Sequence, residues 1–553
     1  MPQAPASPPP PPPATWRVLQ LELALDEPES LLRARAAQVL GLDPAELRGS
    51  RIALKALDAR VRGAARRLQW VCHVDLMVDA GRVTPAMKRA MRSGRVKLAP
   101  AAAAVERPER HPSLVGPGVD PVVVVGSGPA GLFAAYLLAR NGVRVTLLER
   151  GPAIRERGLA VVRFHRTREV DPERNLLFGE GGAGTYSDGK IYTRVDDPLE
   201  LPLLEELVAC GAPPAIVYDS GAHIGTDKLH RLLPRLRARL MDLGVSFHFD
   251  TRLTGLRLDA GGGRVRAVVT ERGELPCAAL VLAIGHSARD TWAMLAAAGL
   301  AFEAKPFQLG LRIEHPQELI DRGRYGGPIP QLGAASYNLV SRATPAAAAA
   351  HSFCMCPGGR VVASISEPHL LCTNGMSNAS HSSAWASAAI VTTVGPEQFG
   401  AGAFDGVAFQ RALEARCFAA GGGDYTAPAQ GAADFLAGRP TTKGLRHSTY
   451  PFGTVPGRLD ELLPPAVRDA VAQALLRFDR LIPGYAGNEG QLLGLESRSS
   501  GPVRMPRDPV TRRAVGLANV YPVGEGAGYA GGIMSAALDG ANTAVALVEG
   551  GVG

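Results

Sequence analysis

A pair of cysteines separated by one residue, Cys354 and Cys356, occurs in the segment HSFCMCPGG, three residues after His351. Such a pair can form a redox-active disulfide, or one thiolate can react beside a redox cofactor. The spacing also suits two ordinary core cysteines, because a disulfide across one intervening residue closes a small, strained ring. Both interpretations remain open, and both cysteines are candidate catalytic residues. No further ligands stand at a spacing that predicts a metal site.

A glycine motif, G-x-G-x-x-G, follows the apolar run VVVV and precedes the helical pattern LFAAYLLARNG. This order of strand, glycine turn and helix is typical of a dinucleotide-binding βαβ unit, in which the helix N-terminus faces a pyrophosphate. An acidic residue lies 23 positions after the first glycine, where it can accept hydrogen bonds from a ribose diol and disfavours a 2′-phosphate. The predicted cofactor contacts are Gly126, Gly128, Pro129, Ala130, Gly131, Glu149 and Arg150.

The C-terminal segment YPVGEGAGYAGGIMSAALDG repeats the order of strand, glycine loop and helix. A flavin needs a carboxylate for its ribityl hydroxyls and a helix N-terminus that favours negative charge at its N1/O2 end. A simple NAD dehydrogenase does not need this second element. The sequence therefore predicts FAD, with contacts from Gly524, Glu525, Gly531, Gly532 and Ile533.

The segment GEGGAGTYSDGK partly matches a phosphate-binding P-loop. Ile191 stands where that loop carries Ser or Thr for magnesium, and IYTRV is predicted to be a strand rather than a helix. We therefore expect this backbone to pack against the flavin, with polar groups near its reactive edge. The alternative is a glycine-rich turn with a solvated lysine. The predicted cofactor contacts are Gly181, Gly182, Gly184 and Thr185, and the candidate catalytic residues are Tyr186 and Lys190.

Two further positions carry candidate chemistry. Gly285 and His286 end the apolar strand CAALVLAIGH, where Gly285 is a predicted cofactor contact and His286 is either a proton donor or a residue that lines the loop. Arg312 lies on the probable strand GLRIEHP and shares a face with Glu314. Arg312 and Glu314 can bind a carboxylate substrate or form a surface ion pair.

Four segments together resemble the FAD-dependent dehydrogenase family, that is, the NAD(P)/FAD-dependent oxidoreductases of the glutathione-reductase-type FAD fold. They are VVVVGSGPAGLFAAYLLARNGVRVTLLERG, NLLFGEGGAGTYSDGKIYTR, SFCMCPGG and YPVGEGAGYAGGIMSAALDG. The resemblance extends from about residue 60 onward and supplies no substrate. It implies an FAD domain, an inserted C-terminal domain and a small N-terminal domain. Flavoproteins of this fold usually carry Asp at the position of Glu525.

The predicted fold class is α/β: a Rossmann-like FAD domain with a central parallel sheet, an inserted α+β domain and a small N-terminal α/β module. The expected organisation is a proline-rich tail (1–15), a basic module (16–100), a linker (101–120), the first part of the FAD domain (121–305), an inserted substrate domain (306–504) and a C-terminal return (505–553). The apolar window from Pro121 contains GSGPAG, which favours strand, turn and helix over a transmembrane helix.

Positive charge is concentrated at the front of the chain. Residues 1–112 contain 18 Lys/Arg and 11 Asp/Glu, while the whole chain has a net charge of +8. The basic residues either form a solvated surface or bind RNA or a protein partner through residues 16–112. Seven cysteines at irregular spacing and the lack of a signal peptide favour a reducing, cytoplasmic location.

These observations predict an FAD-dependent oxidoreductase that transfers a hydride between a small organic substrate and flavin N5. No second dinucleotide motif appears, so either the substrate reduces the flavin or NAD(P)H docks transiently. One alternative is a flavoprotein that acts on or binds RNA or a protein through its basic module. Another is a membrane-peripheral dehydrogenase that reduces quinones.

Overall fold

The computed structural model describes residues 14–62, 65–107 and 110–552. The chain divides into two compact units, which are described separately. The first is formed by the described residues up to Ala103 with the short segments Pro214–Ala222 and Ile329–Gln331, and the second contains the other described residues. In the described ranges, no helix has the length and apolar character that a membrane crossing requires.

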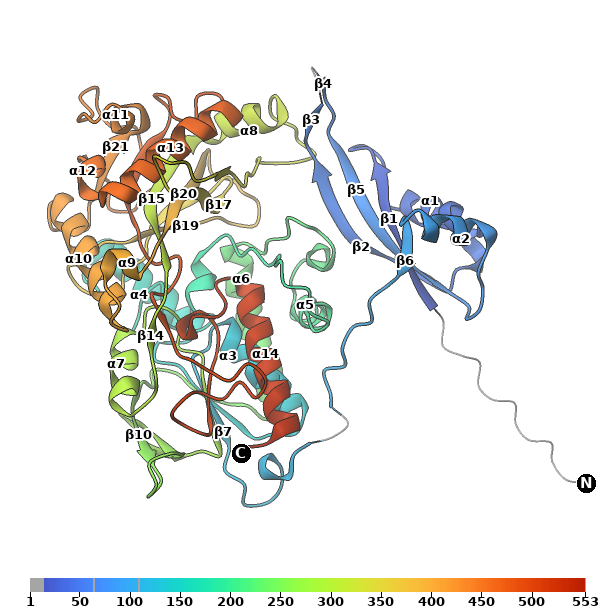
Figure 1. Ribbon diagram of the computed structural model, residues 1–553, viewed down its shortest axis with the longest axis horizontal. Coiled ribbons are helices and arrows are strands. Elements are labelled where there is room, and N and C mark those ends of the chain that lie inside the picture. Colours follow the sequence, from blue (N-terminus) through green and yellow to red (C-terminus); the bar gives the residue numbers. More distant parts are fainter. Residues whose placement is uncertain (1–13, 63–64, 108–109, 553) are drawn as a thin grey trace, which may run out of the picture. The chain divides into compact units, whose positions relative to one another are not determined.

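The first unit is an antiparallel sheet with two helices in the order βαββαβ. The sheet order is β2-β5-β1-β6, and α1 and α2 lie on one face (Figure 1), which is the ferredoxin-like arrangement. This agrees with the expected α/β module. The elements are β1 (Ala14–Leu23), α1 (Leu31–Leu40), β2 (Gly49–Asp58), β5 (Gln69–Val78), α2 (Pro85–Arg92) and β6 (Val96–Leu98), with a small ribbon of β3 (Val61–Arg62) and β4 (Ala65–Arg66).

Many basic side chains of this unit are paired with acids of the same unit. Asp75 is buried, and its carboxylate forms salt bridges with Arg17 at 2.6 Å and with Arg51 at 2.9 Å. Lys55 pairs with Glu29 at 2.6 Å and lies 4.4 Å from the ring centre of Trp70. Ion pairs therefore occupy some of the basic side chains of this unit, and nucleic-acid binding by this unit stays a prediction.

The second unit contains a five-stranded parallel sheet in the order β25-β13-β7-β8-β9. All four valines of β7 are buried, as a parallel strand covered on both faces requires. Helices α3 and α14 pack side by side (Figure 1). The predicted Rossmann-like fold is confirmed. Its elements are β7 (Val122–Val125), α3 (Pro129–Arg140), β8 (Val145–Leu148), β9 (Ser246–His248), β13 (Ala279–Leu282), β25 (Val520–Pro522) and α14 (Ile533–Gly550).

Further elements surround this sheet. A three-stranded antiparallel sheet follows β9, and α7 packs on its first strand. Helix α6 contacts α3 and α4, beside the glycine-rich segment that precedes it in the chain. These elements are α4 (Ile154–Thr167), α5 (Glu200–Ala209), α6 (Thr226–Asp242), β10 (Leu253–Leu258), β11 (Val265–Thr270), β12 (Gly273–Pro276) and α7 (Arg289–Ala297).

The inserted part begins and ends at a two-stranded ribbon, in which β14 (Glu303–Ala304) pairs with β24 (Val503–Arg504). Between them lies a seven-stranded sheet in the order β16-β17-β20-β15-β23-β21-β22. Its strands are β15 (Phe307–Pro316), β16 (Val340–Ser341), β17 (Ala350–Cys356), β20 (Trp385–Val394), β21 (Ala427–Gly431), β22 (Thr454–Pro456) and β23 (Gln491–Glu496). A separate ribbon joins β18 (Arg360–Ala363) to β19 (Thr373–Met376), and two short helices, α8 (Gln317–Tyr325) and α9 (Pro396–Phe399), lie in the connections.

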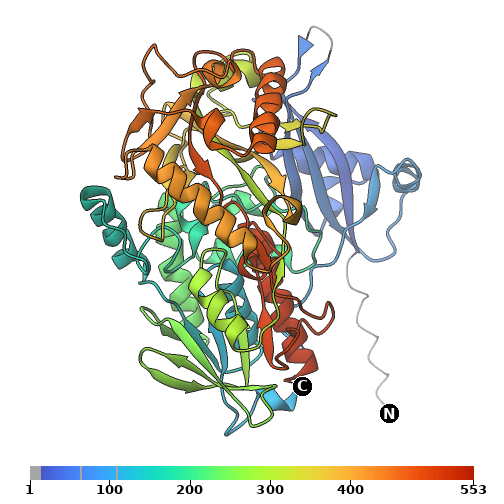
Figure 2. The ribbon, with the colours of Figure 1, turned by 60° about the vertical axis from the view of Figure 1, so that its left-hand side comes forward.

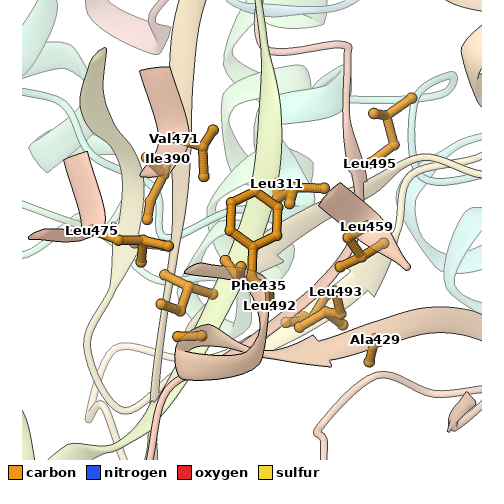
Figure 3. Packing of buried hydrophobic residues seen from close by; sticks show 14 of the residues in the cluster. Leu311, Ile390, Ala429, Phe435, Leu459, Val471, Leu475, Leu492, Leu493 and Leu495 are labelled. Atoms are coloured by element: carbon orange, nitrogen blue, oxygen red, sulfur yellow. The ribbon is translucent and has the colours of Figure 1, made fainter. Parts of the chain in front are cut away.

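Helices cover one face of the seven-stranded sheet. In Figure 2 the orange helices α10 (Asp405–Ala420) and α13 (Pro465–Leu481) lie against it, together with α11 (Ala432–Leu436) and α12 (Leu459–Leu462). Figure 3 shows Val471 and Leu475 of α13 beside Ile390 of β20, with Leu311 of β15 next to Phe435. This core holds the sheet rigid, so its opposite side can present side chains at fixed positions.

Candidate active site

A cavity of about 560 Å³ is lined by both glycine motifs and by the inserted part of the chain. One wall is formed by the loop after β7 and the start of α14. The other includes β17 and Asn374 of β19. The two sequence motifs far apart in the chain therefore meet at one site, because β7 and β25 both flank β13 with their carboxyl ends at the same edge.

The first glycine motif is shaped by close backbone packing. A Cβ on Gly126, whose φ is +106°, would lie 2.2 Å from the carbonyl oxygen of Ala283. A Cβ on Gly131 would lie 1.9 Å from the carbonyl oxygen of Gly126, so Gly131 permits the helix to approach the strand and does not itself line the cavity. Gly128, Pro129 and Ala130 do line it.

Two helix N-termini open into this cavity. Gly128 is the N-cap of α3 and provides no side-chain cap, so the first N–H groups of that helix lack intrahelical partners. Gly531, Gly532 and Ile533, at the start of α14, line the same cavity. Partial positive charge at both ends favours anions. The residues present therefore fit the pyrophosphate and the N1/O2 end of FAD.

Glu149 is fixed at the end of β8, with 5% of its surface exposed. One carboxylate oxygen accepts hydrogen bonds from the backbone N–H and hydroxyl of Ser127, at 2.8 and 2.7 Å, and the other from the N–H groups of Gly151 and Gly179. Glu149 lines the cavity, where ribose hydroxyls can donate to it. Arg150 lies 4.1 Å from the ring centre of Phe178 and is paired with Glu173 and Asp290.

Glu525 enters the cavity from the C-terminal return. Its carboxylate accepts a hydrogen bond from the N–H of Gly501 at 2.8 Å, and a Cβ on Gly531 would lie 2.7 Å from its other oxygen. Burial raises the pKa of Glu525, while Lys305 at 3.8 Å acts in the opposite direction. The carboxylate and the adjacent Gly524 both line the cavity, and their contact with the ribityl chain stays a prediction.

The glycine-rich segment touches the first motif backbone to backbone. A Cβ on Gly182 would lie 3.0 Å from the Cα of Gly128, and Gly182 and Gly184 line the cavity. Gly181 and Thr185 lie outside its wall: the Thr185 hydroxyl donates to the carbonyl of Glu180 at 3.3 Å. These two predicted cofactor contacts therefore shape the loop and do not line the cavity.

The structure places Tyr186 away from the cavity. Residues 183–186 form a 3-10 turn that directs the ring inward, 4.9 Å from the guanidinium of Arg157 and among buried apolar side chains. Within the described residues its buried hydroxyl has no hydrogen-bond partner. The segment IYTRV also forms no strand, and a single bridge pairs His223 with Lys190, the residue just before this segment. The predictions of a reactive tyrosine and a strand here are not supported.

Lys190 lines the cavity and is held by neighbours rather than by solvent. Its ammonium donates to Asp188 and to the carbonyl of Met355, and Asp188 also pairs with His381 at 3.2 Å. Burial disfavours the ammonium, but the charge of Asp188 raises the pKa of Lys190 above its ordinary value. The solvated lysine considered from the sequence is wrong, and a fixed positive charge faces the site.

His286 and the adjacent Gly285 also line the cavity. Burial lowers the pKa of His286 to about 4, and Arg498 and Arg289 add to this effect. Its Nδ1 lies 2.9 Å from the hydroxyl of Ser287. At neutral pH this imidazole is uncharged, so it offers a hydrogen bond and not the proton of an imidazolium.

Arg312 is fully buried and does not line the cavity. Its guanidinium donates to the carbonyl of Cys354 at 3.3 Å and to Ser387, and lies 3.6 Å from Glu496. Glu314 accepts instead from the Thr449 N–H at 3.1 Å. Arg312 and Glu314 therefore form neither a carboxylate-binding site nor a surface ion pair, and both predictions are wrong. The reason is that β15 is a central strand of the seven-stranded sheet, which buries both side chains.

Cys354 lines the cavity, and Cys356 is buried behind it. Asp188, Asn374, Arg498 and Ser499 line the cavity as well and were not predicted. The signal for Arg498 and Ser499 was present in the sequence, since ESRSS follows directly after the apolar run QLLGL. Asn374 carries no such signal.

Glu496 is a buried carboxyl beside Arg312, and its protonation can be tested. It is fully buried and neither carboxylate oxygen makes a hydrogen bond within the described residues. Burial raises its pKa to about 8, although Arg312 opposes this. The pKa of this carboxyl is therefore higher in the folded chain than in the unfolded chain. Its contribution to stability is fully present when the pH is below the pKa of the unfolded chain, and it is lost as the pH rises through about 8.

A Glu496→Gln variant removes this titration. We expect the wild-type free energy of unfolding to fall by up to about 1.4 kcal/mol per pH unit between the two pKa values. The variant should lack that slope and gain relative stability as the pH rises. Urea unfolding of both proteins across this range measures the difference. Parallel pH profiles for the two proteins would show that Glu496 is ionised throughout.

Two family descriptions match this chain. The FAD binding domain matches residues 120–279, and the domain described as FAD-dependent protein, C-terminal domain-like, matches residues 306–499. An uncharacterized protein of Clostridium beijerinckii is 42% identical over 431 residues, which are 77% of this chain and 80% of that protein.

Solved structures give more distant matches. L-proline dehydrogenase from P. horikoshii is 12% identical with a TM-score of 0.32, covering 78% of this chain and 94% of that one. Iminodiacetate oxidase from Chelativorans sp. BNC1 is 14% identical with a TM-score of 0.33, covering 78% and 96%.

The parallel sheet, its two glycine motifs and the FAD binding domain match define an FAD-dependent oxidoreductase with FAD as its cofactor. The chain belongs to the family of FAD-dependent oxidoreductases in which the FAD binding domain is joined to an FAD-dependent C-terminal domain.

Proposed function

We propose that this oxidoreductase transfers a hydride between a small organic substrate and N5 of bound FAD. One observation carries the proposal: the inserted part of the chain and both glycine motifs line the same cavity. A substrate held by the inserted part therefore contacts the cofactor directly. Bound FAD supplies the two-electron redox chemistry, and the protein supplies binding, orientation and charge.

The chain offers distinct groups for these tasks. Lys190, held by Asp188, places a fixed positive charge at the wall, which favours an anionic or electron-rich part of a substrate. His286 is neutral and offers a hydrogen bond. Substrate selection falls to the residues that the inserted part contributes to the wall, among them Tyr337, Asn338, His351, Phe353 and Asn374.

Two electron donors are compatible with this arrangement. The organic substrate can reduce the flavin, or NAD(P)H can dock transiently in the cavity without a dinucleotide motif of its own.

The seven cysteines are free in the structure, which supports a reducing compartment such as the cytoplasm as the place of action.

The absorption spectrum of the purified protein tests this proposal. We expect the bands of oxidised flavin, followed by anaerobic bleaching when the reductant is added. NADH and NADPH are added first in separate samples, and candidate small organic anions follow. Bleaching by one nicotinamide nucleotide identifies the donor, and bleaching by an organic substrate alone identifies a substrate-reduced dehydrogenase. A colourless protein that takes up no added FAD contradicts the proposal.

A further inference from the structure

The backbone at Cys354 departs from a regular strand. Cys354 has φ of +41°, a left-handed value that is uncommon for residues other than glycine. The pairing of β17 with β20 shifts register between Phe353 and Cys356. In a regular strand, side chains two residues apart stand on one face about 7 Å from each other. Here the bend brings the two sulfur atoms to 3.9 Å.

The surroundings of the pair make the two cysteines unequal. Cys354 is partly exposed and lines the cavity, whereas Cys356 is fully buried and its thiol donates to the carbonyl of Cys354 at 3.3 Å. The thiol of Cys356 and the positive charges of Lys190 and Arg312 lower the pKa of Cys354 to about 6. One sulfur is therefore reactive and faces the site, and the other is held beside it.

Neighbouring residues leave space for the two cysteine side chains and hold the turn between them. A Cβ on Gly375 would lie 3.0 Å from the sulfur of Cys356 and 2.1 Å from the guanidinium of Arg312. The Met355 carbonyl, between the two cysteines, accepts from Lys190, and the Cys354 carbonyl accepts from Arg312 at 3.3 Å. The strained turn is thus fixed from both sides, as strained backbone at functional sites commonly is.

We propose that Cys354 and Cys356 are a redox-active pair that exchanges two electrons with bound FAD. This deepens the proposed function and rests on it for the cofactor's place in the cavity. On oxidation, both S–H bonds break and one S–S bond forms. The two electrons and two protons convert oxidised FAD to its reduced form. The reverse step returns them and restores both thiols, so the exchange balances without another reactant.

Anaerobic reconstitution tests the exchange directly. Apoprotein with all seven cysteines reduced is mixed with one equivalent of oxidised FAD, and no substrate is added. We expect part of the flavin absorbance to bleach, with two thiols lost per FAD reduced. The peptide that contains Cys354 and Cys356 should become lighter by two hydrogen atoms. Thiol counting after denaturation and mass spectrometry read out the protein side independently of activity.

Variants identify the sulfur atoms that take part. Cys354→Ser and Cys356→Ser should bind FAD, as judged by its absorption spectrum, but show neither bleaching nor thiol loss. Cys210→Ser alters a buried cysteine next to α5 and should behave like the wild-type chain. If Cys356→Ser fails to fold, Cys354→Ser and Cys354→Ala at the partly exposed position carry the test.

The outcomes separate this proposal from hydride transfer. Wild-type protein that binds FAD yet keeps all seven thiols and an unbleached flavin overturns the redox pair. If a substrate still bleaches that flavin, the proposed function stands alone. Thiol loss that is identical in Cys354→Ser and the wild type also overturns the assignment.

Discussion

The Gly128→Val variant is expected to fold like the wild-type chain but to bind FAD at least about 100-fold more weakly, a loss of about 2.7 kcal/mol. Gly128 has ordinary dihedral angles, with φ of −73° and ψ of 178°, so a side chain there causes no backbone strain. A Cβ would meet only the Cα of Gly182, at 3.8 Å. The added methyl groups instead occupy the cavity beside the N-terminus of α3, where the pyrophosphate needs bare backbone.

Fluorescence titration of apoprotein with FAD measures this loss, and thermal unfolding of the apoprotein checks the fold. Gly158→Ala is the matched control: Gly158 lies in α4 with open space around it, so affinity should stay unchanged. Gly126→Val gives the contrasting result, since its Cβ has no room beside Ala283 and folding itself should fail. Unaltered affinity in Gly128→Val would place the pyrophosphate elsewhere.

Replacing Glu414 with Gln is expected to reduce the free energy of unfolding by about 3–5 kcal/mol, because it leaves two buried guanidinium groups with only the partly exposed Glu367 as a counter-charge. Glu414 is fully buried on α10 and accepts from Arg498 at 2.7 Å and from Arg289 at 3.1 Å. Arg289 begins α7 of the FAD domain, so this network joins the two parts of the second unit. Urea unfolding measures the loss.

The contribution of Glu414 to stability depends on pH with the opposite sign to that of Glu496. Burial acts against ionisation of Glu414, but Arg498 and Arg289 hold its pKa well below the ordinary carboxyl value. Its contribution is therefore present above the unfolded pKa and is lost as the pH falls. Glu367→Gln is the control, because that carboxylate is 23% exposed and should cost much less. Equal losses in the two variants would contradict a role for burial.

The FAD domain could be predicted from the sequence because its signals are local. VVVV, the three glycines and the following helix occupy one short stretch, and a parallel strand buried on both faces leaves a continuous apolar run. Glu149 could be found for the same reason, since it ends the next strand. The C-terminal motif required only a second instance of the same local pattern.

The inserted part could not be predicted in the same way. Arg312 stands on a strand that looks half-exposed from its sequence, and only the neighbouring strands β20 and β23 bury it. Tyr186 turns inward because it ends the 3-10 turn Ala183–Tyr186, which the strand-like pattern of the residues after it does not reveal. The 3.9 Å approach of the Cys354 and Cys356 sulfurs depends on a register shift against β20, where Cys356 pairs with Ser387, 31 residues further along the chain.

The ribbon of β14 and β24 offers a defined site for engineering. Because the chain leaves the FAD domain and returns to it at one antiparallel pair, the intervening residues are tethered at adjacent ends. An insertion with adjacent ends disturbs its host little, which is why such positions accept foreign domains. Recombination at this ribbon can therefore exchange the entire segment between relatives as one cassette, provided that the new segment keeps the contacts to the FAD domain, such as those from Gly501 to Glu525 and from Glu414 to Arg289.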